Sequence, residues 1–135
     1  MRDIWKQTIT RRDLLAGAAS VGLGAVAASC GLPGTTANQL MLAVSMLAAQ
    51  EGLRLAGEYG LQPEDVLPVI ERSTGASWAA ANWETVLSWW RDYQPGEALG
   101  IIVKDMRSLL DDAAERHVPL PVAAVAFQRL HDVWR

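Results

Sequence analysis

One lysine stands out among the side chains that could take part in chemistry. Lys104 lies beside Asp105 in the apolar segment GIIVKDMRSLL, and the chain has no other lysine after Lys6. A lysine on a helix surface commonly pairs with a neighbouring carboxylate, and such an exposed pair contributes at most about 1 kcal/mol to stability. The segment therefore raises the question of whether Lys104 is only the solvated partner of an acid or also contacts a ligand.

The other reactive side chains and the overall charge exclude several classes of protein. The single cysteine, Cys30, cannot form an internal disulfide, and His117 and His131 do not have the spacing of metal ligands, so no metal site is expected. The formal net charge is -3 and the basic residues form no cluster, so we expect no nucleic-acid surface. Half of the residues are apolar, which is enough to form the core of one domain.

The first 30 residues resemble an export signal. Thr10 to Leu15 match the twin-arginine pattern, in which Arg11 and Arg12 precede one further residue and two leucines, and an uncharged run then leads to Cys30. The end of that run, VAASCG, resembles the processing site of bacterial lipoproteins, in which the cysteine is acylated and becomes the first residue. We therefore expect residues 1–29 to be removed, Cys30 to be acylated, and the protein to be periplasmic or anchored to the membrane by its lipid.

The uncharged run is not expected to span the membrane permanently. It does not exceed the roughly 20 residues that a membrane-spanning helix needs, so we expect contact with the membrane only through the signal or the lipid. The same segment could instead form a buried helix of a compact protein. If the N-terminus is not a working signal, the protein is expected in the cytoplasm.

Beyond the signal, the sequence predicts an all-α domain over residues 31–135. The domain shows no period-two alternation of polar and apolar residues, which would predict a strand. Gly60 is expected to end the first helix as a C-cap, Pro63 to lie in the first turn of the second, and Ser77 to open the third. About five helices are expected, over residues 35–60, 62–75, 77–90, 97–117 and 121–135.

The apolar residues of these segments predict which side chains are buried. The first helix is apolar almost all round in its first half, so we expect its start to be deeply buried. In the fourth helix the expected apolar stripe consists of Ile101, Ile102, Met106, Leu109 and Leu110. Four tryptophans do not share one face of a straight helix, and we expect them in the core or in an interface: Trp78, Trp83, Trp89 and Trp90.

The order of three motifs resembles that of a known family. GLPGTTANQLMLAVSM, GLRLAGEYGLQPEDVLPVIERSTGASW and DYQPGEALGIIVKDMRSLLDDAAERHVPLP follow one another as in the C-terminal helical domain of the 3-hydroxyisobutyrate dehydrogenase group. These enzymes are NAD(P)-dependent β-hydroxyacid dehydrogenases and are related to 6-phosphogluconate dehydrogenase. The resemblance covers residues 31–135. It implies a helical domain of the 6-phosphogluconate dehydrogenase C-terminal type and an oxidoreductase that acts on 3-hydroxy acids.

The resemblance also implies roles for three residues. Lys104 stands where the family has a lysine that contacts the NAD or NADP cofactor, and Asn38 stands where the family has an asparagine that contacts the substrate. Near a helix start, however, Asn38 is expected to cap the backbone instead. The catalytic lysine of the family is replaced by Thr35, whose hydroxyl does not titrate near neutrality, so no catalytic residue is expected in this chain.

Three hypotheses for function follow. We expect a β-hydroxyacid dehydrogenase-like domain that is catalytically incomplete and does not bind NAD or NADP alone, because a Rossmann domain is not found in these 135 residues. The second hypothesis is a dehydrogenase half that is complemented by a separate Rossmann-domain chain. The third is an exported, lipid-anchored binding or scaffold protein that reuses the fold. The family also implies a homodimer, in which residues 39–50 and the Trp89–Trp90 pair are expected to be covered.

Overall fold

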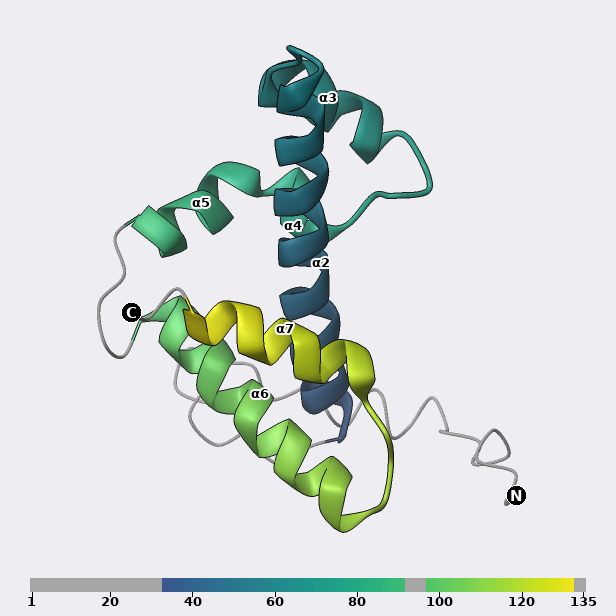
Figure 1. Cartoon of the computed structure of the whole chain (residues 1–135), viewed down its shortest axis with the longest axis vertical. Helices are drawn as coiled ribbons and strands as arrows, with labels where there is room; N and C mark the ends of the chain where they lie inside the picture. Colours follow the sequence, from purple (N-terminus) through teal and green to yellow (C-terminus); the bar gives the residue numbers. More distant parts are fainter. Residues whose placement is uncertain (1–32, 92–96, 133–135) are drawn as a thin grey trace, which may run out of the picture.

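The computed structural model describes residues 33–91 and 97–132. Over these residues the protein consists of α-helices joined by turns, without a strand, so the predicted all-α fold is confirmed (Figure 1). The third predicted helix is divided in two, which makes six helices in the described part of the chain. They are α2 (Pro33–Glu58), α3 (Pro63–Glu71), α4 (Trp78–Ala81), α5 (Trp83–Arg91), α6 (Ala98–Glu115) and α7 (Pro121–Asp132).

Helix α2 is the axis around which the other helices pack. Its 26 residues extend for about 39 Å at the usual rise of 1.5 Å per residue. Helices α6 and α7 contact one end of α2 and each other, whereas α3 and α4 contact the opposite part of α2 (Figure 1). Helix α5 continues from α4 and returns the chain to α6.

The core is formed mainly where α2, α6 and α7 meet. Helix α6 buries six side chains on one stripe, which includes three of the five predicted residues; Leu110 is only half-buried. Ile102, Met106 and Leu109 are buried as predicted, but Ile101 is 38% exposed because it lies beside the stripe. The buried side chains of α6 are Leu99, Ile102, Val103, Met106, Leu109 and Ala113.

The prediction of a deeply buried start for α2 is wrong. Buried side chains begin only at Ala43 and recur at Met46 and Ala49, whereas Met41 is 70% exposed. Helices α6 and α7 pack against one side of this part of α2, so a segment that is apolar all round leaves apolar side chains on the other side.

The third predicted helix is interrupted at Asn82. The Asn82 backbone has φ -122° and ψ 37°, and its side-chain amide donates to the carbonyl oxygen of Trp78 at 2.9 Å. Asparagine side chains compete with the helical backbone in this way. The expected helix start is confirmed, because the Ser77 hydroxyl accepts a hydrogen bond from the Ala80 amide at 3.1 Å.

The break at Asn82 lies between Trp78 of α4 and Trp89 of α5, whereas Trp83 and Trp90 lie seven residues apart on α5 itself. The rings of Trp78 and Trp89 stack with centroids 5.8 Å apart and an interplanar angle of 19°. Trp83 and Trp90 lie at the same separation but are tilted by 55°. Only Trp83 is fully buried, and Trp78 is 53% exposed, so the group lies at the edge of the core.

Two helix ends use a residue in the left-handed conformation. Gly60 has φ 79°, with the amide of Leu61 bonded to the carbonyl of Ala56, and this confirms the predicted glycine C-cap after α2. Helix α6 ends in the same hydrogen-bond pattern, but there the left-handed residue is His117, with φ 57°.

Candidate functional site

The start of α2 and the middle of α6 are joined by a hydrogen bond between side chains. The Gln39 amide nitrogen donates to a carboxylate oxygen of Asp105 at 2.9 Å, across 66 residues of sequence, and the contact is partly buried. Only 18% of the Asp105 side chain is exposed. The bond therefore places the ANQ sequence of α2 next to the VKD sequence of α6, the two segments in which candidate residues were predicted.

Lys104 reaches solvent from this junction. Its side chain is 66% exposed, and its ammonium nitrogen lies 3.6 Å from a carboxylate oxygen of Asp105. The pair with a neighbouring acid that was considered from the sequence is therefore present. An exposed pair of this kind contributes at most about 1 kcal/mol, so it does not prevent Lys104 from turning toward a ligand.

Thr35 and Asn38 lie on α2 near the same junction. Thr35 is half-buried and stands four residues before Gln39, which puts both residues on one side of the helix. Asn38 is exposed and adjacent to Gln39. The expectation that Asn38 caps a helix start is wrong: α2 begins at Pro33, so Asn38 lies inside the helix, beyond the positions that a cap occupies.

Gln39 and Asp105 were not predicted to be in contact. The one sequence feature that pointed to them was their position beside Asn38 and Lys104. Their pairing across 66 residues depends on how α2 and α6 pack. The side chains gathered at this end of the α2–α6 contact can donate and accept hydrogen bonds. They are Thr35, Asn38, Gln39, Lys104 and Asp105. Thr35 cannot serve as an acid or base near neutral pH.

Several predicted features can be placed only in part. Cys30 and the predicted signal over residues 1–30 lie outside the described residues. None of the helices in the described ranges has the length and hydropathy needed to cross a membrane. Within the same ranges, His, Cys, Asp and Glu side chains do not come together in any group of three that could hold a metal ion.

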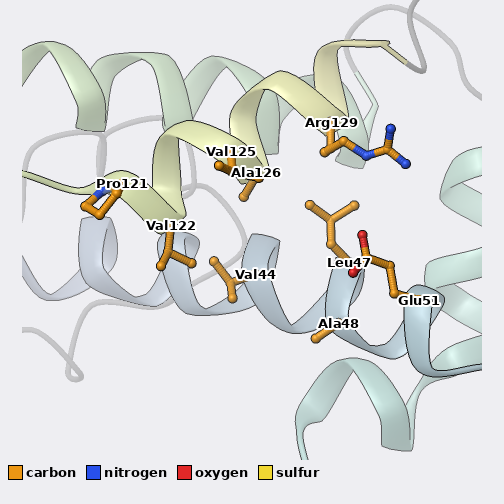
Figure 2. A pocket seen from close by; sticks show the side chains of 9 residues that line it. All are labelled: Val44, Leu47, Ala48, Glu51, Pro121, Val122, Val125, Ala126 and Arg129. Atoms are coloured by element: carbon orange, nitrogen blue, oxygen red, sulfur yellow. The ribbon is translucent and has the colours of Figure 1, made fainter.

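A concave region lies between α2 and α7, away from the Gln39–Asp105 contact, and we call it the α2–α7 groove. It has a volume of about 370 Å³ and is lined mostly by aliphatic side chains of both helices (Figure 2). Glu51 of α2 and Arg129 of α7 line one end of it. This groove could not be predicted from sequence patterns, because its lining comes from two helices that are far apart in the chain.

Comparison with known proteins relates the chain to hydroxyacid dehydrogenases. The L-threonate dehydrogenase of Cupriavidus necator is 38% identical over 92 residues, which cover 67% of this chain and 30% of the relative. The 2-(hydroxymethyl)glutarate dehydrogenase of Eubacterium barkeri is 34% identical over 93 residues, with 67% and 30% covered. The chain therefore spans about a third of the length of these relatives.

A solved structure and a family model agree with these relatives. The crystal structure of 3-hydroxyisobutyrate dehydrogenase from Salmonella typhimurium matches with a TM-score of 0.61 at 30% identity, over 73% of this chain and 34% of that one. The family model described as NAD-binding of NADP-dependent 3-hydroxyisobutyrate dehydrogenase matches residues 35–134, which include every described residue of the Gln39–Asp105 junction. The chain therefore belongs to the family of 3-hydroxyisobutyrate dehydrogenase NAD-binding domains.

Proposed function

We propose that this domain forms the helical side of a nicotinamide dinucleotide site in a β-hydroxyacid dehydrogenase, and that it does not complete the reaction on its own. The observation that carries the proposal is the Gln39–Asp105 hydrogen bond, because it brings the α2 and α6 candidates to one junction. In this proposal Lys104 contacts NAD or NADP, and Asn38 contacts the substrate. Both side chains are exposed at the junction and can reach a ligand there.

The junction suits a cofactor that carries phosphates and hydroxyl groups. The Lys104 ammonium has three donors on a flexible stem, and Asp105 beside it is held by Gln39. A bound NAD or NADP would supply the hydride acceptor. The cofactor must be fixed about 3 to 3.5 Å from the reacting carbon, so we propose that the remaining contacts come from a Rossmann domain packed against this junction.

Thr35 is the reason for proposing an incomplete site. Removal of a positioned acid or base typically slows a reaction by about 10²- to 10⁴-fold. Thr35 lies on the side of α2 that carries Gln39, so a lysine at this position would extend from the same junction. The substitution Thr35→Lys is therefore a direct test of what the domain lacks.

A chimeric enzyme tests these roles. Residues 35–134 would replace the matching region of the Cupriavidus necator L-threonate dehydrogenase, and NADH and NADPH binding and L-threonate turnover would be measured. We expect the chimera to bind cofactor but to turn over slowly, and Thr35→Lys to raise kcat by about 10²-fold or more. Lys104→Ala should weaken cofactor binding by about fivefold or more, the equivalent of one lost charged contact.

Arg54→Ala provides the matched control for Lys104→Ala. Arg54 is an exposed cation on α2, about 24 Å along the helix from Asn38. This variant should leave cofactor binding unchanged. Two outcomes would contradict the proposal. One is turnover at the rate of the parent enzyme by the chimera that keeps threonine at position 35, and the other is a cofactor affinity that Lys104→Ala does not change.

We also propose export, on the basis of the sequence of the first 30 residues. The twin-arginine pattern at Arg11 and Arg12 and the small residues before Cys30 support a lipid-anchored form. Two acyl chains would hold such a protein at the membrane, whereas one chain alone binds only marginally. Fractionation of cells that express the wild type and Cys30→Ala tests this, and an unprocessed cytosolic chain in both cases would count against it. An exported form would favour a binding or scaffold role.

A homodimer is the third part of the proposal. Met41, which lies within the segment expected to be covered, is 70% exposed, and the rings of Trp89 and Trp90 are partly exposed. Large exposed apolar patches commonly mark interaction sites. Sedimentation at micromolar concentration should give the mass of a dimer, and Met41→Glu should reduce it to the mass of a monomer; a wild-type monomer would argue against this part.

A further inference from the structure

The α2–α7 groove combines an apolar body with two charges at one end. Val44 and Leu47 face the groove from α2, and Val122 and Val125 face it from α7 (Figure 2). Glu51 follows Val44 by seven residues, two helical turns later, and Arg129 follows Val122 by the same spacing. The two helices therefore bring their charged residues to the same end and their aliphatic residues to the other.

The aliphatic walls of this groove are open to solvent. Val122 is 60% exposed and Val125 is 64% exposed, whereas Ala126 between them and the core is buried. Neighbouring valines on one helix face are an unusual surface for a soluble domain unless something covers them. The volume of about 370 Å³ is within the range of small-molecule sites, which are mostly apolar with a few fixed polar groups.

The two charges are available to a ligand. The ion pairs found within the described residues are Lys104–Asp105 and Arg116–Asp112, and neither Glu51 nor Arg129 takes part in one. Both side chains are exposed, and they extend from opposite helices at the mouth of the groove (Figure 2). A ligand that contacts both of them would carry a cationic group for Glu51 and an anionic group for Arg129.

We propose that the α2–α7 groove binds a small aliphatic α-amino acid. Its ammonium group would pair with the Glu51 carboxylate, and its carboxylate would accept two hydrogen bonds from the Arg129 guanidinium. Its side chain would lie between Val44 and Leu47 on one wall and Val122 and Val125 on the other. This ligand class satisfies both charges at one end and covers apolar surface at the other, which neither a simple fatty acid nor a simple amine does.

The proposed dimer contact is argued from Met41, which does not line the groove, and the shape of the groove disfavours a second copy of the chain as its occupant. An isologous contact brings the same patch to itself, and two concave surfaces meeting in this way would enclose unfilled space. The groove is also separate from the proposed cofactor site. Glu51 lies twelve residues after Gln39 on α2, or about 18 Å along the helix axis.

Binding of L-leucine to the full 135-residue chain tests the inference. Methyl resonances of the groove valines would be followed during titration, together with heats of binding. Because both charge pairs are exposed, we expect saturation with a Kd of about 1 mM. Two analogues dissect the site: 4-methylpentanoate lacks the ammonium group and 3-methylbutylamine lacks the carboxylate, and each should bind about fivefold more weakly or worse.

Substitutions that remove the charge of Glu51 or Arg129 test the same two contacts by changing the protein and not the ligand. Glu51→Gln and Arg129→Gln should each weaken L-leucine binding by about fivefold or more. Glu51→Gln should leave the affinity for 4-methylpentanoate unchanged or raise it, because it removes a repulsive charge. Glu84→Gln on α5 and Arg72→Gln after α3 are exposed controls that should leave binding unchanged.

Three results would overturn the inference. One is the absence of saturable L-leucine binding to the wild type, and another is equal binding of leucine and both analogues. The third is a concentration-dependent association of the wild type that Val125→Glu abolishes and L-leucine does not affect, which would show that a second copy covers the groove. Loss of the proposed cofactor contact at Lys104 would leave all of these measurements unchanged, so the two proposals fail independently.

Discussion

The two ends of α2 lie in regions that are built differently. Around its start and middle, α6 and α7 pack against α2, and Met46, Met106 and Leu130 are completely inaccessible to solvent there. Near its end, α3 packs without a single buried residue, and its contact with the core is made by partly buried side chains such as Leu67. Both regions are helical, but α3 contributes no fully buried side chain.

The two regions are expected to contribute unequally to the free energy of folding. Burial of a large apolar side chain contributes roughly 1.5 to 3 kcal/mol, so the α2–α6–α7 region holds most of the free energy of folding. The guanidinium of Arg107 on α6 also lies 5.7 Å from the ring centroid of Phe127 on α7. The proposed cofactor junction and the α2–α7 groove both lie on helices that are anchored to this core, and helical elements hold side chains in more precise positions than loops do.

The region around α3 depends more on turns and caps. The Asp65 carboxylate accepts a hydrogen bond from the Gln62 amide at 3.3 Å at the start of α3. Tyr59, Leu61 and Val69 are exposed there by 77%, 48% and 64%. Removal of one of these side chains should therefore cost little, whereas a change in backbone geometry should cost more.

The largest contrast is expected from truncation of one side chain in each region. Met106→Ala should lower the free energy of unfolding by about 2 to 5 kcal/mol, because it leaves a cavity in the core. Val69→Ala in α3 should lower it by less than about 0.5 kcal/mol, because Val69 is exposed. Urea unfolding of both variants measures the difference, and equal losses would show that the two regions do not differ as described.

The next effect concerns the turn after α2. Gly60→Ala places a Cβ at φ 79°, and a left-handed conformation costs an L-residue about 1 to 2 kcal/mol. A clash plays no part, since no atom lies within 4 Å of the position that the Cβ would take. The same unfolding assay should show this loss. Gly57→Ala, which is inside α2 and has equal space, should instead leave stability unchanged or raise it.

A smaller effect is expected at the start of α4. Ser77→Ala removes the hydroxyl that accepts from the Ala80 amide and should cost about 1 kcal/mol. Because α4 positions Trp78 against Trp89, the variant should also change the near-ultraviolet circular dichroism of the tryptophans. Ser77→Thr keeps the acceptor and serves as the control. Unchanged stability in Ser77→Ala would mean that packing alone holds this helix.

The smallest effect should be a gain in stability. His117→Gly relieves the left-handed backbone at the end of α6, where no glycine is present, and should raise the free energy of unfolding by about 0.5 kcal/mol. The gain is smaller than the loss from Gly60→Ala, because glycine also increases the entropy of the unfolded chain. Thermal unfolding is the measurement, and a lower Tm would show that the His117 side chain contributes contacts that outweigh the strain.

The amino-acid sequence alone determined the features that depend on neighbours in the chain. Turn residues set the helix ends, so the all-α fold, the C-cap at Gly60 and the N-cap at Ser77 were predicted correctly. The apolar period of α6 predicted Ile102, Met106 and Leu109 in the core. The family was also recognisable, because short motifs in a fixed order are a property of the sequence itself.

The tertiary structure decided what depends on contacts between distant segments. Which side of the all-apolar α2 start is covered could not be predicted, since only the packing of α6 and α7 on one side leaves Met41 exposed. The break at Asn82, where the side-chain amide and the backbone amide both donate to the Trp78 carbonyl, could not be predicted from the helical pattern of the surrounding residues. The Gln39–Asp105 bond and the α2–α7 groove depend on packing between helical segments that are more than 60 residues apart in the chain. Sequence periodicity does not indicate which helices pack together.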